Sequence, residues 1–144
     1  MYKSLFIIIF TTIFGIVAGR AQAVRAQPPL DAAKYIEISD NDHDFGNITF
    51  GVPVEYHVLL KNISNDTLAL TNIVVSCGCT TPDYKPGLYP PGTAIDIKVA
   101  YSSDIEGVFN KQLSVVLQDK KDGQMVKIIR FHGTGIAGKN ENNF

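Results

Sequence analysis

The sequence contains no tryptophan and only two cysteines in 144 residues. Cys77 and Cys79 stand on either side of one glycine, which excludes the inter-sheet disulfide and packed tryptophan of antibody domains. An HExxH zinc motif, a phosphate-binding P-loop and a dinucleotide fingerprint are also missing, and no serine stands in a nucleophile elbow. We therefore expect a protein that is not an enzyme and that carries no cofactor.

Clustered positive charge is absent as well. The chain has 13 lysine and arginine residues against 14 aspartate and glutamate residues, and no basic run. Loss of residues 1–23 would remove Lys3 and Arg20, which leaves 11 basic residues against the same 14 acidic ones. Because binding to nucleic acid needs clustered cations that displace counterions from the phosphates, no nucleic-acid partner is expected.

The N-terminus has the composition of a secretory signal peptide. Lys3 provides a positive start, residues 5–17 are almost continuously apolar, and Ala21-Gln22-Ala23 is a small-x-small cleavage pattern. The alternative is an uncleaved anchor, although the apolar run is shorter than the roughly 20 residues of a membrane span. A second cleavage pattern at residues 24–26 leaves the cleavage position open, and no nearby cysteine marks a lipoprotein. We predict an exported protein, periplasmic or extracellular, with a signal peptide at residues 1–23 and no stable membrane span after cleavage.

After a proline-containing stretch assigned as a linker (residues 24–34), the pattern becomes that of β-strands. Apolar and polar residues alternate in residues 54–61, 95–101 and 113–117, the period expected of strands with one buried face. Further strands are predicted at residues 35–38, 68–76 and 125–132. The apolar phase shifts near Thr71-Asn72, where we expect a bulge, and is ambiguous at Ile128-Ile129.

Turn-forming residues separate these strands, at residues 62–66, 82–87, 90–92 and 120–123. No helix of three turns is predicted after the signal peptide, which excludes the crossover helices of a parallel α/β sheet. Short, regularly spaced strands indicate an all-β fold. We predict one immunoglobulin-like antiparallel β-sandwich of about seven strands in residues 35–136, and a disordered tail at residues 137–144.

Cys77-Gly78-Cys79 is the most unusual feature of the sequence. One interpretation is a local disulfide that rigidifies a turn, because so small a loop removes little entropy from the denatured state. A second is a redox pair, since a strained and exposed disulfide is readily reduced. A third is a soft-metal site, because thiolates favour Cu(I) or zinc. The structural turn is favoured because no catalytic group accompanies the pair.

The histidines do not complete a metal site in the sequence. His43, His57 and His132 are far apart, and two thiolates are too few for tetrahedral zinc. His57 is expected on the outward face of its strand. His43 lies in the acidic stretch of residues 40–44, which lacks the spacing of an EF-hand loop and is typical of a solvated turn. The identity of any bound metal therefore stays open.

Several motifs occur in an order that resembles a bacterial family. The motif residues are Asp44, Phe45 and Gly46, then Cys77, Gly78, Cys79 and Thr80, then Pro91 and Gly92, then Phe109 and Asn110. Over residues 38–135 the chain is similar to the family catalogued as domain of unknown function 1573, which is abundant in Bacteroidetes. The resemblance implies an Ig-like sandwich related to ASPM-SPD-2-Hydin and major-sperm-protein domains, export to the periplasm or cell surface, and no established activity. Unlike common members, this chain carries a single copy and no lipoprotein cysteine.

The motif residues also have structural interpretations. Gly46 should allow a sharp exit from the first strand region, and Phe45 and Phe109 should lie in the core. Prolines at positions 82, 90 and 91 should end strands, because proline donates no ladder hydrogen bond. Gly107 and Asn110 should flank a turn before the strand at residue 113.

Thr67 is a candidate for modification. Asp66-Thr67-Leu68 matches the short O-glycosylation pattern of Bacteroidetes and falls in a predicted turn, although so short a pattern also arises by chance.

The leading functional hypothesis is a non-catalytic binding or scaffold module of the bacterial cell envelope, which engages a protein partner through an exposed sheet edge. The alternatives are thiol redox or copper handling at Cys77-Gly78-Cys79, and an edge-strand periplasmic chaperone.

Overall fold

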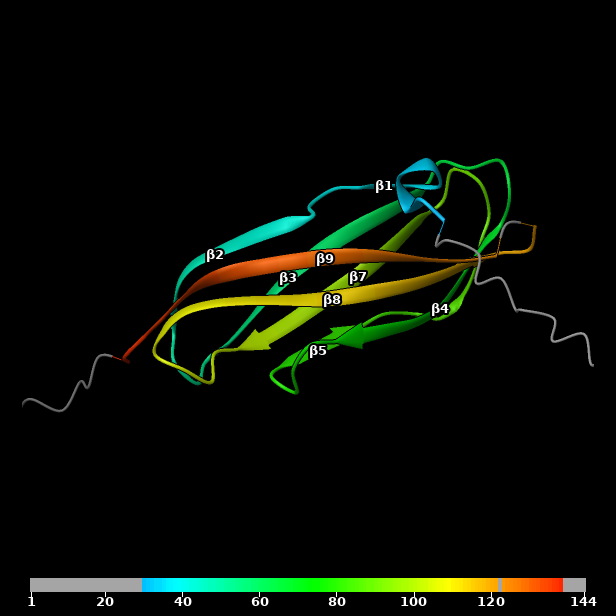
Figure 1. Cartoon of the computed structure of the whole chain (residues 1–144). Helices are drawn as coiled ribbons and strands as arrows, with labels where there is room; N and C mark the ends of the chain where they lie inside the picture. The colour runs from blue at the N-terminus through cyan, green and yellow to red at the C-terminus, as the bar shows by residue number, and fades with distance from the viewer. Residues whose placement is uncertain (1–29, 122, 139–144) are drawn as a thin grey trace, which may run out of the picture.

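The computed structural model describes residues 30–121 and 123–138, which form two packed β layers (Figure 1). This part of the chain holds nine strands and one 3-10 turn, η1 (Ala32–Lys34). The strands are β1 (Ile36–Ile38), β2 (Asp42–Thr49), β3 (Pro53–Asn62), β4 (Leu68–Val75), β5 (Thr80–Asp83), β6 (Gly87–Tyr89), β7 (Ala94–Ser102), β8 (Gly107–Asp119) and β9 (Gly123–Ile136). The all-β class is confirmed. The predicted signal peptide lies outside the described residues, as do residues 139–144 of the predicted tail.

The expected number of about seven strands was too low, because short strands leave no period in the sequence. β5 and β6 contain four and three residues and lie within or next to a segment assigned to turns. Pro82 was expected to end a strand, but it lies inside β5, opposite Val99. β5 is an edge strand, where a residue without an N–H is tolerated.

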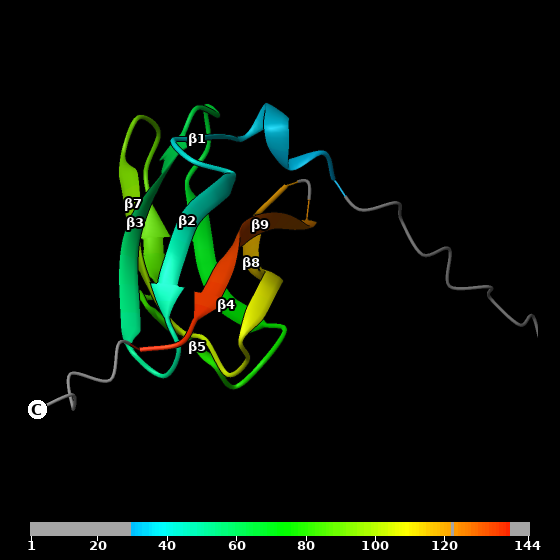
Figure 2. The same cartoon turned by 90° about the vertical axis from the view of Figure 1, so that its left-hand side faces the viewer.

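The strands form two sheets that face each other (Figure 2). One sheet has the order β1-β3-β7-β5, and the other has the order β2-β9-β8-β4-β6. One pair of strands departs from the expected antiparallel pairing, because β2 and β9 are parallel. A crossover helix is needed only when parallel strands follow one another closely in the chain. β2 and β9 have most of the domain between them, and the intervening strands make the connection.

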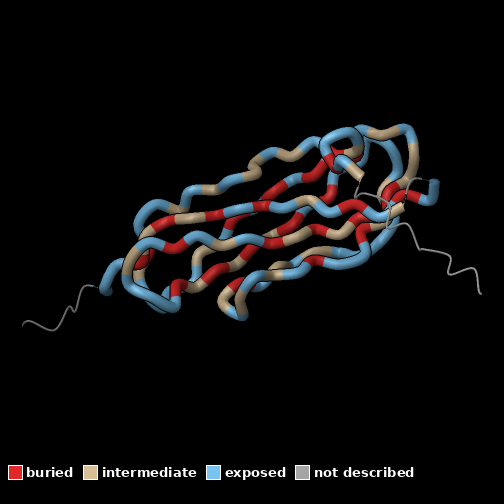
Figure 3. The backbone as a smooth tube through the Cα atoms, in the orientation of Figure 1, coloured by how far each residue is buried: buried red, intermediate tan, exposed pale blue. Residues whose placement is uncertain are grey.

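The core lies between the two sheets and consists of the inward residues of each strand (Figure 3). Period-two alternation places Val58, Leu60 and Ile97 inside from the four-stranded sheet, and Leu113, Val115 and Phe131 from the five-stranded sheet. Each of these side chains is fully buried. Burial of one such side chain contributes about 1.5–3 kcal/mol, so the predicted alternation accounts for most of the driving force for folding.

Two strands are irregular at the two places where the apolar alternation of the sequence shifts or is ambiguous. The register of β4 against β8 shifts between Leu70 and Asn72, which confirms the predicted bulge. In β9, Ile129 is buried, whereas Ile128 points outward and is 37% exposed. The outward position of Ile128 explains why an apolar residue there broke the alternation.

The segment before β1 packs on the sandwich. Leu30 forms a parallel bridge to Met125 of β9, and Ala32 in η1 is buried. The Asp31 carboxylate caps η1 by accepting the Ala33 N–H at 3.1 Å. These residues belong to the stretch assigned as a linker. In the described part of the chain, no helix is long and apolar enough to cross a membrane.

Candidate functional site

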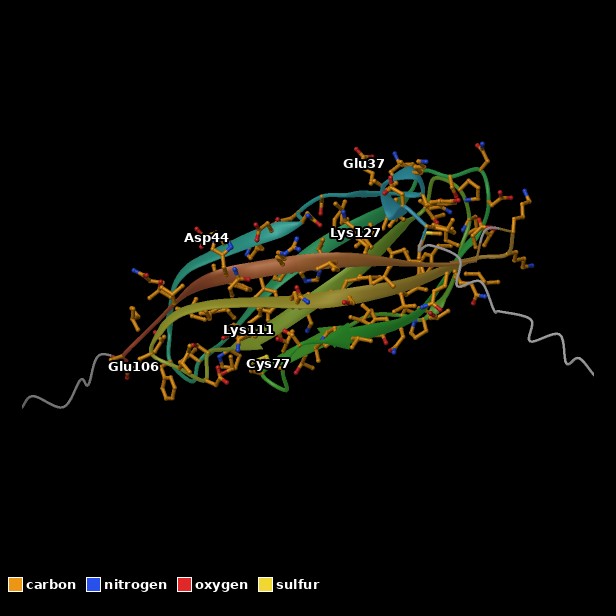
Figure 4. All side chains as sticks on the ribbon, in the orientation of Figure 1. Glu37, Asp44, Cys77, Glu106, Lys111 and Lys127 are labelled. Carbon is orange, nitrogen blue, oxygen red and sulfur yellow. A yellow bond between two sulfur atoms is a disulfide. The ribbon has the colours of Figure 1, made fainter. Side chains whose placement is uncertain are left out.

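The two cysteines lie at the corner where the chain passes from one sheet to the other. β4 of the five-stranded sheet ends at Val75, and β5 of the four-stranded sheet begins at Thr80. Cys77 and Cys79 are joined by a disulfide between Cα atoms 5.3 Å apart, and Figure 4 labels Cys77 at this corner. The disulfide therefore closes the turn that connects the layers.

Backbone hydrogen bonds hold the same corner. The N–H of Thr80 donates to the Cys77 carbonyl at 3.3 Å, and the N–H of Ser102 donates to the Cys79 carbonyl at 3.1 Å. The buried Thr80 hydroxyl lies 3.4 Å from the Cys77 sulfur. Thr80 thus has a structural place in the motif, as the first residue of β5 and the packing partner of the disulfide.

The chemistry open to the corner depends on reduction of the disulfide. Both cysteines are only half-buried, so a reductant or a partner thiol can approach them. As long as the bond is formed, neither sulfur is a thiolate, and thiolate is the form that binds soft metals and attacks disulfides. Among residues 30–121 and 123–138, no group of three or more His, Cys, Asp or Glu side chains is placed to hold a metal ion.

Asp44, Phe45 and Gly46 form a bulge in β2. The Asp44 carboxylate accepts the Gly46 N–H at 2.8 Å, and Gly46 has φ +63°, a left-handed conformation that favours glycine. The register against β9 shifts between Asp44 and Asn47. Gly46 was expected to end a strand region, but it lies within β2 and kinks it. The predicted need for a glycine here is confirmed, and its location is corrected.

Phe45 and Phe109 pack around this bulge. Phe109 is fully buried, and half-buried Phe45 makes an edge contact with Phe131 at a ring separation of 5.8 Å. Gly133 of β9 faces both elements, because a Cβ on it would lie 2.7 Å from the Gly46 carbonyl oxygen and 2.7 Å from the Phe109 ring. The bulge in β2, the Phe109 ring and Gly133 thus pack together and attach β2 to β9.

The turn that contains Pro91 and Gly92 is organised by Asn62, a residue that the sequence interpretation missed. Gly92 has φ +79° and donates its N–H to the Asn62 carbonyl at 2.8 Å. The fully buried Asn62 amide donates to the carbonyls of Asp66 and Tyr89, both at 2.9 Å. Its carboxamide oxygen accepts the Ser64 N–H at 3.0 Å and the Ser64 hydroxyl at 2.7 Å. Asn62 therefore ties two loops at one end of the sandwich.

Three further residues singled out in the sequence lie away from the disulfide corner. Asn110 was expected in a turn, but it is an exposed residue within β8 opposite His132. Gly107 likewise begins β8 rather than flanking a separate turn. Thr67 is half-buried just before β4, and its modification stays a prediction.

Each of the three histidines pairs with aspartate. On β2, His43 Nδ1 lies 2.7 Å from Asp40, and the ring stacks on Tyr56 at 4.2 Å. His57 lies 3.0 Å from Asp96 on the outward face, as predicted. His132 lies 3.3 Å from Asp42. The expected solvated turn at residues 40–44 was wrong in part, because residues 42–44 belong to β2 and His43 packs on the core.

Tyr56 is the inward partner of His43. Its hydroxyl is buried without a hydrogen-bond partner in the described residues. Burial, with a smaller contribution from the Asp40 carboxylate, raises the pKa of Tyr56 far above its usual value. The phenol therefore stays neutral at physiological pH, and the His43–Tyr56 contact is a packing contact rather than a source of a reactive phenolate.

The motif residues are thus distributed over the fold. The CGC corner joins β4 to β5, the Asp44–Gly46 bulge lies on β2, and the turn at Gly92 lies beside Asn62. No nucleophile, base and acid converge among the described motif residues. What the motifs share is that each one fixes a corner, a bulge or a turn.

Comparison with known proteins gives one family and a common fold. The model of the family described as "Protein of unknown function (DUF1573)" matches residues 36–131. A search of curated proteins finds no match.

Solved structures share the fold at low identity. The ASH/PapD-like domain 7 of human CEP192 is 13% identical with a TM-score of 0.60, covering 78% of this chain and 94% of that one. WR4, an MSP family member of C. elegans, is 7% identical with a TM-score of 0.53, covering 72% and 99%. The VesB protease of Vibrio cholerae is 13% identical with a TM-score of 0.61, but the match covers 71% of this chain and only 32% of VesB. At these identities the likeness shows the PapD/MSP-type Ig-like fold alone.

Proposed function

Because the chain belongs to the DUF1573 family of proteins of unknown function, we propose that it acts as an exported, non-catalytic binding or scaffold module of the bacterial cell envelope. The Ig-like fold of the family supports this role without specifying it, since function resides in particular surfaces rather than in a fold. The partner is a protein, and its binding surface is sought on the faces and edges of the two sheets.

The observation that carries the proposal is an apolar surface on the outside of the five-stranded sheet. We call it the outer apolar face, and it consists of Val74, Val116, Val126 and Ile128. Val116 pairs with Val126 across β8 and β9, and Ser114 stands between Val74 and Ile128 in the next row. Val74 is 51% exposed and Val126 is 41% exposed.

Outward positions of a two-layer sandwich meet water and are ordinarily polar. The core itself does not require these apolar residues, because they point away from it. Contiguous exposed apolar surface with polar surroundings is typical of an interaction site. Gln112 and Arg130, which form the next outward row, supply such a polar border.

Capture from envelope extract tests the proposal. The secreted full chain is cross-linked in a membrane and periplasm extract, and captured proteins are identified by mass spectrometry. Wild type should capture a reproducible partner, and the triple variant Val74→Thr/Val126→Thr/Ile128→Thr should lose it, because threonine keeps the β-branched shape and removes the apolar contact. Val108→Thr, at an exposed position of β8 outside this face, is the matched control.

Two results would contradict the proposal: no reproducible partner together with measurable turnover of a substrate, or retention of the full chain in the cytoplasm. The second result is checked by cell fractionation and by N-terminal sequencing of the mature protein. Export rests on residues 1–23, so a chain that lacks them should remain in the cytoplasm.

A second candidate function is thiol redox chemistry or copper handling at Cys77 and Cys79. The observation in its favour is that a disulfide across one glycine lies half-exposed at a corner between the sheets. A count of free thiols in the secreted protein, under native and denaturing conditions, shows whether the pair is oxidised. A redox titration and a Cu(I)-binding assay then compare wild type with Cys77→Ser/Cys79→Ser. Redox chemistry or copper handling is supported only if wild type shows that property and the variant loses it.

Action as an edge-strand chaperone stays a prediction. It is tested by light scattering of a refolding client protein, whose aggregation the chain should suppress.

A further inference from the structure

One stretch of β9 lacks a neighbour on one side. From Arg130 onward, β9 pairs with β2, and the Arg130 N–H donates to the Asn41 carbonyl at 3.0 Å. At Met125, β9 is bridged by Leu30. Residues 126–129 pair with β8 on one side, and the described residues supply no strand on the other. We call this stretch the β9 gap.

The gap exists because the chain leaves the five-stranded sheet and returns to it. After Leu30 the chain forms η1 and then joins the other sheet as β1, and it comes back beside β9 at Asn41. In Figure 2 the blue η1 stands off from the β9 ribbon. Leu30 stands opposite Met125, and Asn41, one residue before the Asp42–Arg130 pair, stands opposite Ile129. These two flanking residues are about 13 Å apart along an extended strand, which leaves room for about three residues of an added strand.

The gap opens into a hollow of about 380 Å³ between η1 and β9. Its wall includes Leu30, Asn41, Val126, Lys127, Ile128 and Arg130. Val126 and Ile128 also belong to the outer apolar face, so the hollow and that face are continuous.

The charges of the hollow are cationic on balance. Lys127, labelled in Figure 4, is half-buried, and Arg130 is exposed. Within the described residues neither cation has a carboxylate partner, whereas Lys98, Lys111 and Lys121 do. The one carboxylate in the wall, that of Asp31, already accepts a hydrogen bond as the cap of η1.

A buried acceptor adds a second, independent feature. The carboxamide oxygen of Asn41 is buried and has no hydrogen-bond partner in the described residues. A buried polar atom without a partner costs roughly 1–3 kcal/mol. Asn41 is also one of the residues that line the hollow.

The other edges of the sheets are poor acceptors of an added strand. β1 and β6 contain only three residues each, and β5 contains Pro82. β2 is bulged at Gly46 and carries exposed Asp42 and Asp44. Short strands, prolines, bulges and charges are the devices that block edge pairing. The β9 gap contains no proline and no bulge, and its one charged residue is Lys127.

From these observations we propose that the β9 gap binds an extended segment of a partner protein as an added parallel or antiparallel strand. The segment carries an apolar side chain that packs on Val126 and Ile128, and an acidic side chain that pairs with Arg130. This inference rests on the proposed binding function and names the class of segment that the module recognises. Backbone hydrogen bonds would supply affinity, and the two side-chain contacts would supply specificity.

The direction of backbone N–H groups gives a sharp test. N–H groups alternate in direction along a strand, and that of Arg130 points toward β2. The N–H of Ile128 therefore points into the gap and not toward β8. Ile128→Pro removes a hydrogen bond that only an added strand would use, whereas Ile128→Thr keeps the N–H and the branched shape.

The probe is a displayed library of random heptapeptides, selected on the secreted full chain. Enriched peptides should contain an aspartate or glutamate flanked by β-branched residues. Their affinity, measured by fluorescence anisotropy, should fall by about tenfold or more in Arg130→Glu, since one charge-assisted hydrogen bond is worth at least that factor. It should also fall in Ile128→Pro, which removes one neutral backbone hydrogen bond, by about threefold or more. Ile128→Thr should weaken binding less than Ile128→Pro, and Lys85→Glu, at an exposed loop, should leave it unchanged.

The outcomes separate this inference from the proposed function. Peptides that bind wild type, Arg130→Glu and Ile128→Pro alike would place the binding surface elsewhere and overturn the inference, while the binding function would stand. A library without enriched acidic peptides would also overturn it, and the capture experiment would decide the function independently. A concentration-dependent dimer that Ile128→Pro abolishes would assign the gap to a second copy of the chain, against the proposal. If circular dichroism shows that Ile128→Pro is unfolded, Arg130→Glu decides alone.

Discussion

Replacement of Asn62 by alanine should greatly lower the stability of the protein, although Asn62 is a polar residue next to surface loops. The side chain makes four hydrogen bonds, two as donor to the carbonyls of Asp66 and Tyr89 and two as acceptor from Ser64. At about 0.5–1.5 kcal/mol per bond, and with two carbonyls left unpaired, Asn62→Ala should lower the free energy of unfolding by about 3 kcal/mol. That is a large part of the roughly 5–15 kcal/mol of a typical domain.

Two further variants make the test specific. Asn62→Asp keeps the acceptor oxygen but turns the other oxygen toward the carbonyls of Asp66 and Tyr89, so at neutral pH it should cost at least as much as alanine. Because burial beside these carbonyls would raise the carboxyl pKa above its unfolded value, stability should recover as the pH falls through that raised pKa, and the recovery should be complete below the unfolded value of about 4. Asn65→Ala, at an exposed neighbouring position, should change stability by less than about 0.5 kcal/mol.

Urea unfolding followed by circular dichroism measures all three variants. A loss of less than about 1 kcal/mol in Asn62→Ala would refute the reasoning, because four buried hydrogen bonds could then be removed at the cost of one. An equal effect of Asn65→Ala would show that the loop as a whole, rather than the Asn62 side chain, determines stability. Recovery of Asn62→Asp at high rather than low pH would contradict the assigned donor and acceptor directions.

The remaining predictions concern the corner, the bulge and a surface pair. Cys77→Ser/Cys79→Ser should lower the free energy of unfolding by only about 1–2 kcal/mol, since the closed loop is tiny; a loss of far more, in thermal unfolding, would contradict a local role. Gly133→Ala should cost about 1–3 kcal/mol, because its Cβ would meet the Gly46 carbonyl and the Phe109 ring at 2.7 Å; unchanged urea unfolding would show that β2 moves freely. Gly46→Ala should cost about 1–2 kcal/mol through its φ of +63° alone, because nothing lies within 4 Å of the added Cβ. His57→Ala should change stability by less than about 1 kcal/mol between pH 5 and pH 8, because the pair with Asp96 is exposed, and a larger pH-dependent change in the same assay would contradict this.

The strands with a long alternating pattern could be predicted from the sequence. In β3 and β7, inward residues such as Val58 and Ile97 are buried and outward residues such as His57 are exposed, because the two faces of a strand alternate residue by residue. The bulge in β4 was predictable for the same reason, since one extra residue reverses the phase. β5 and β6 were not, because three or four residues do not establish a period.

Some features of the candidate sites were likewise predictable from the sequence, and others were not. The need for a glycine at position 46 and the unusual CGC pair were visible in the residues themselves, whereas the position of the pair at the corner between sheets was not. Nothing near Asn62 in the chain indicates that its amide reaches the Tyr89 carbonyl, 27 residues away. Arg130 likewise looked like an ordinary residue of a strand, and Ile128 was marked only by the ambiguous apolar phase at Ile128-Ile129.

The sequence by itself determined the all-β class, the faces of the long strands and the positions of the turns, because these depend on neighbours within a few residues. Only the tertiary structure decided that β2 lies parallel to β9, and that the cysteines lie in the turn that connects the two layers. It also decided that β9 has no strand partner between Leu30 and Asn41 among the described residues. Each of these features depends on where distant segments meet, and local side-chain patterns carry no information about which strand edges will find a partner.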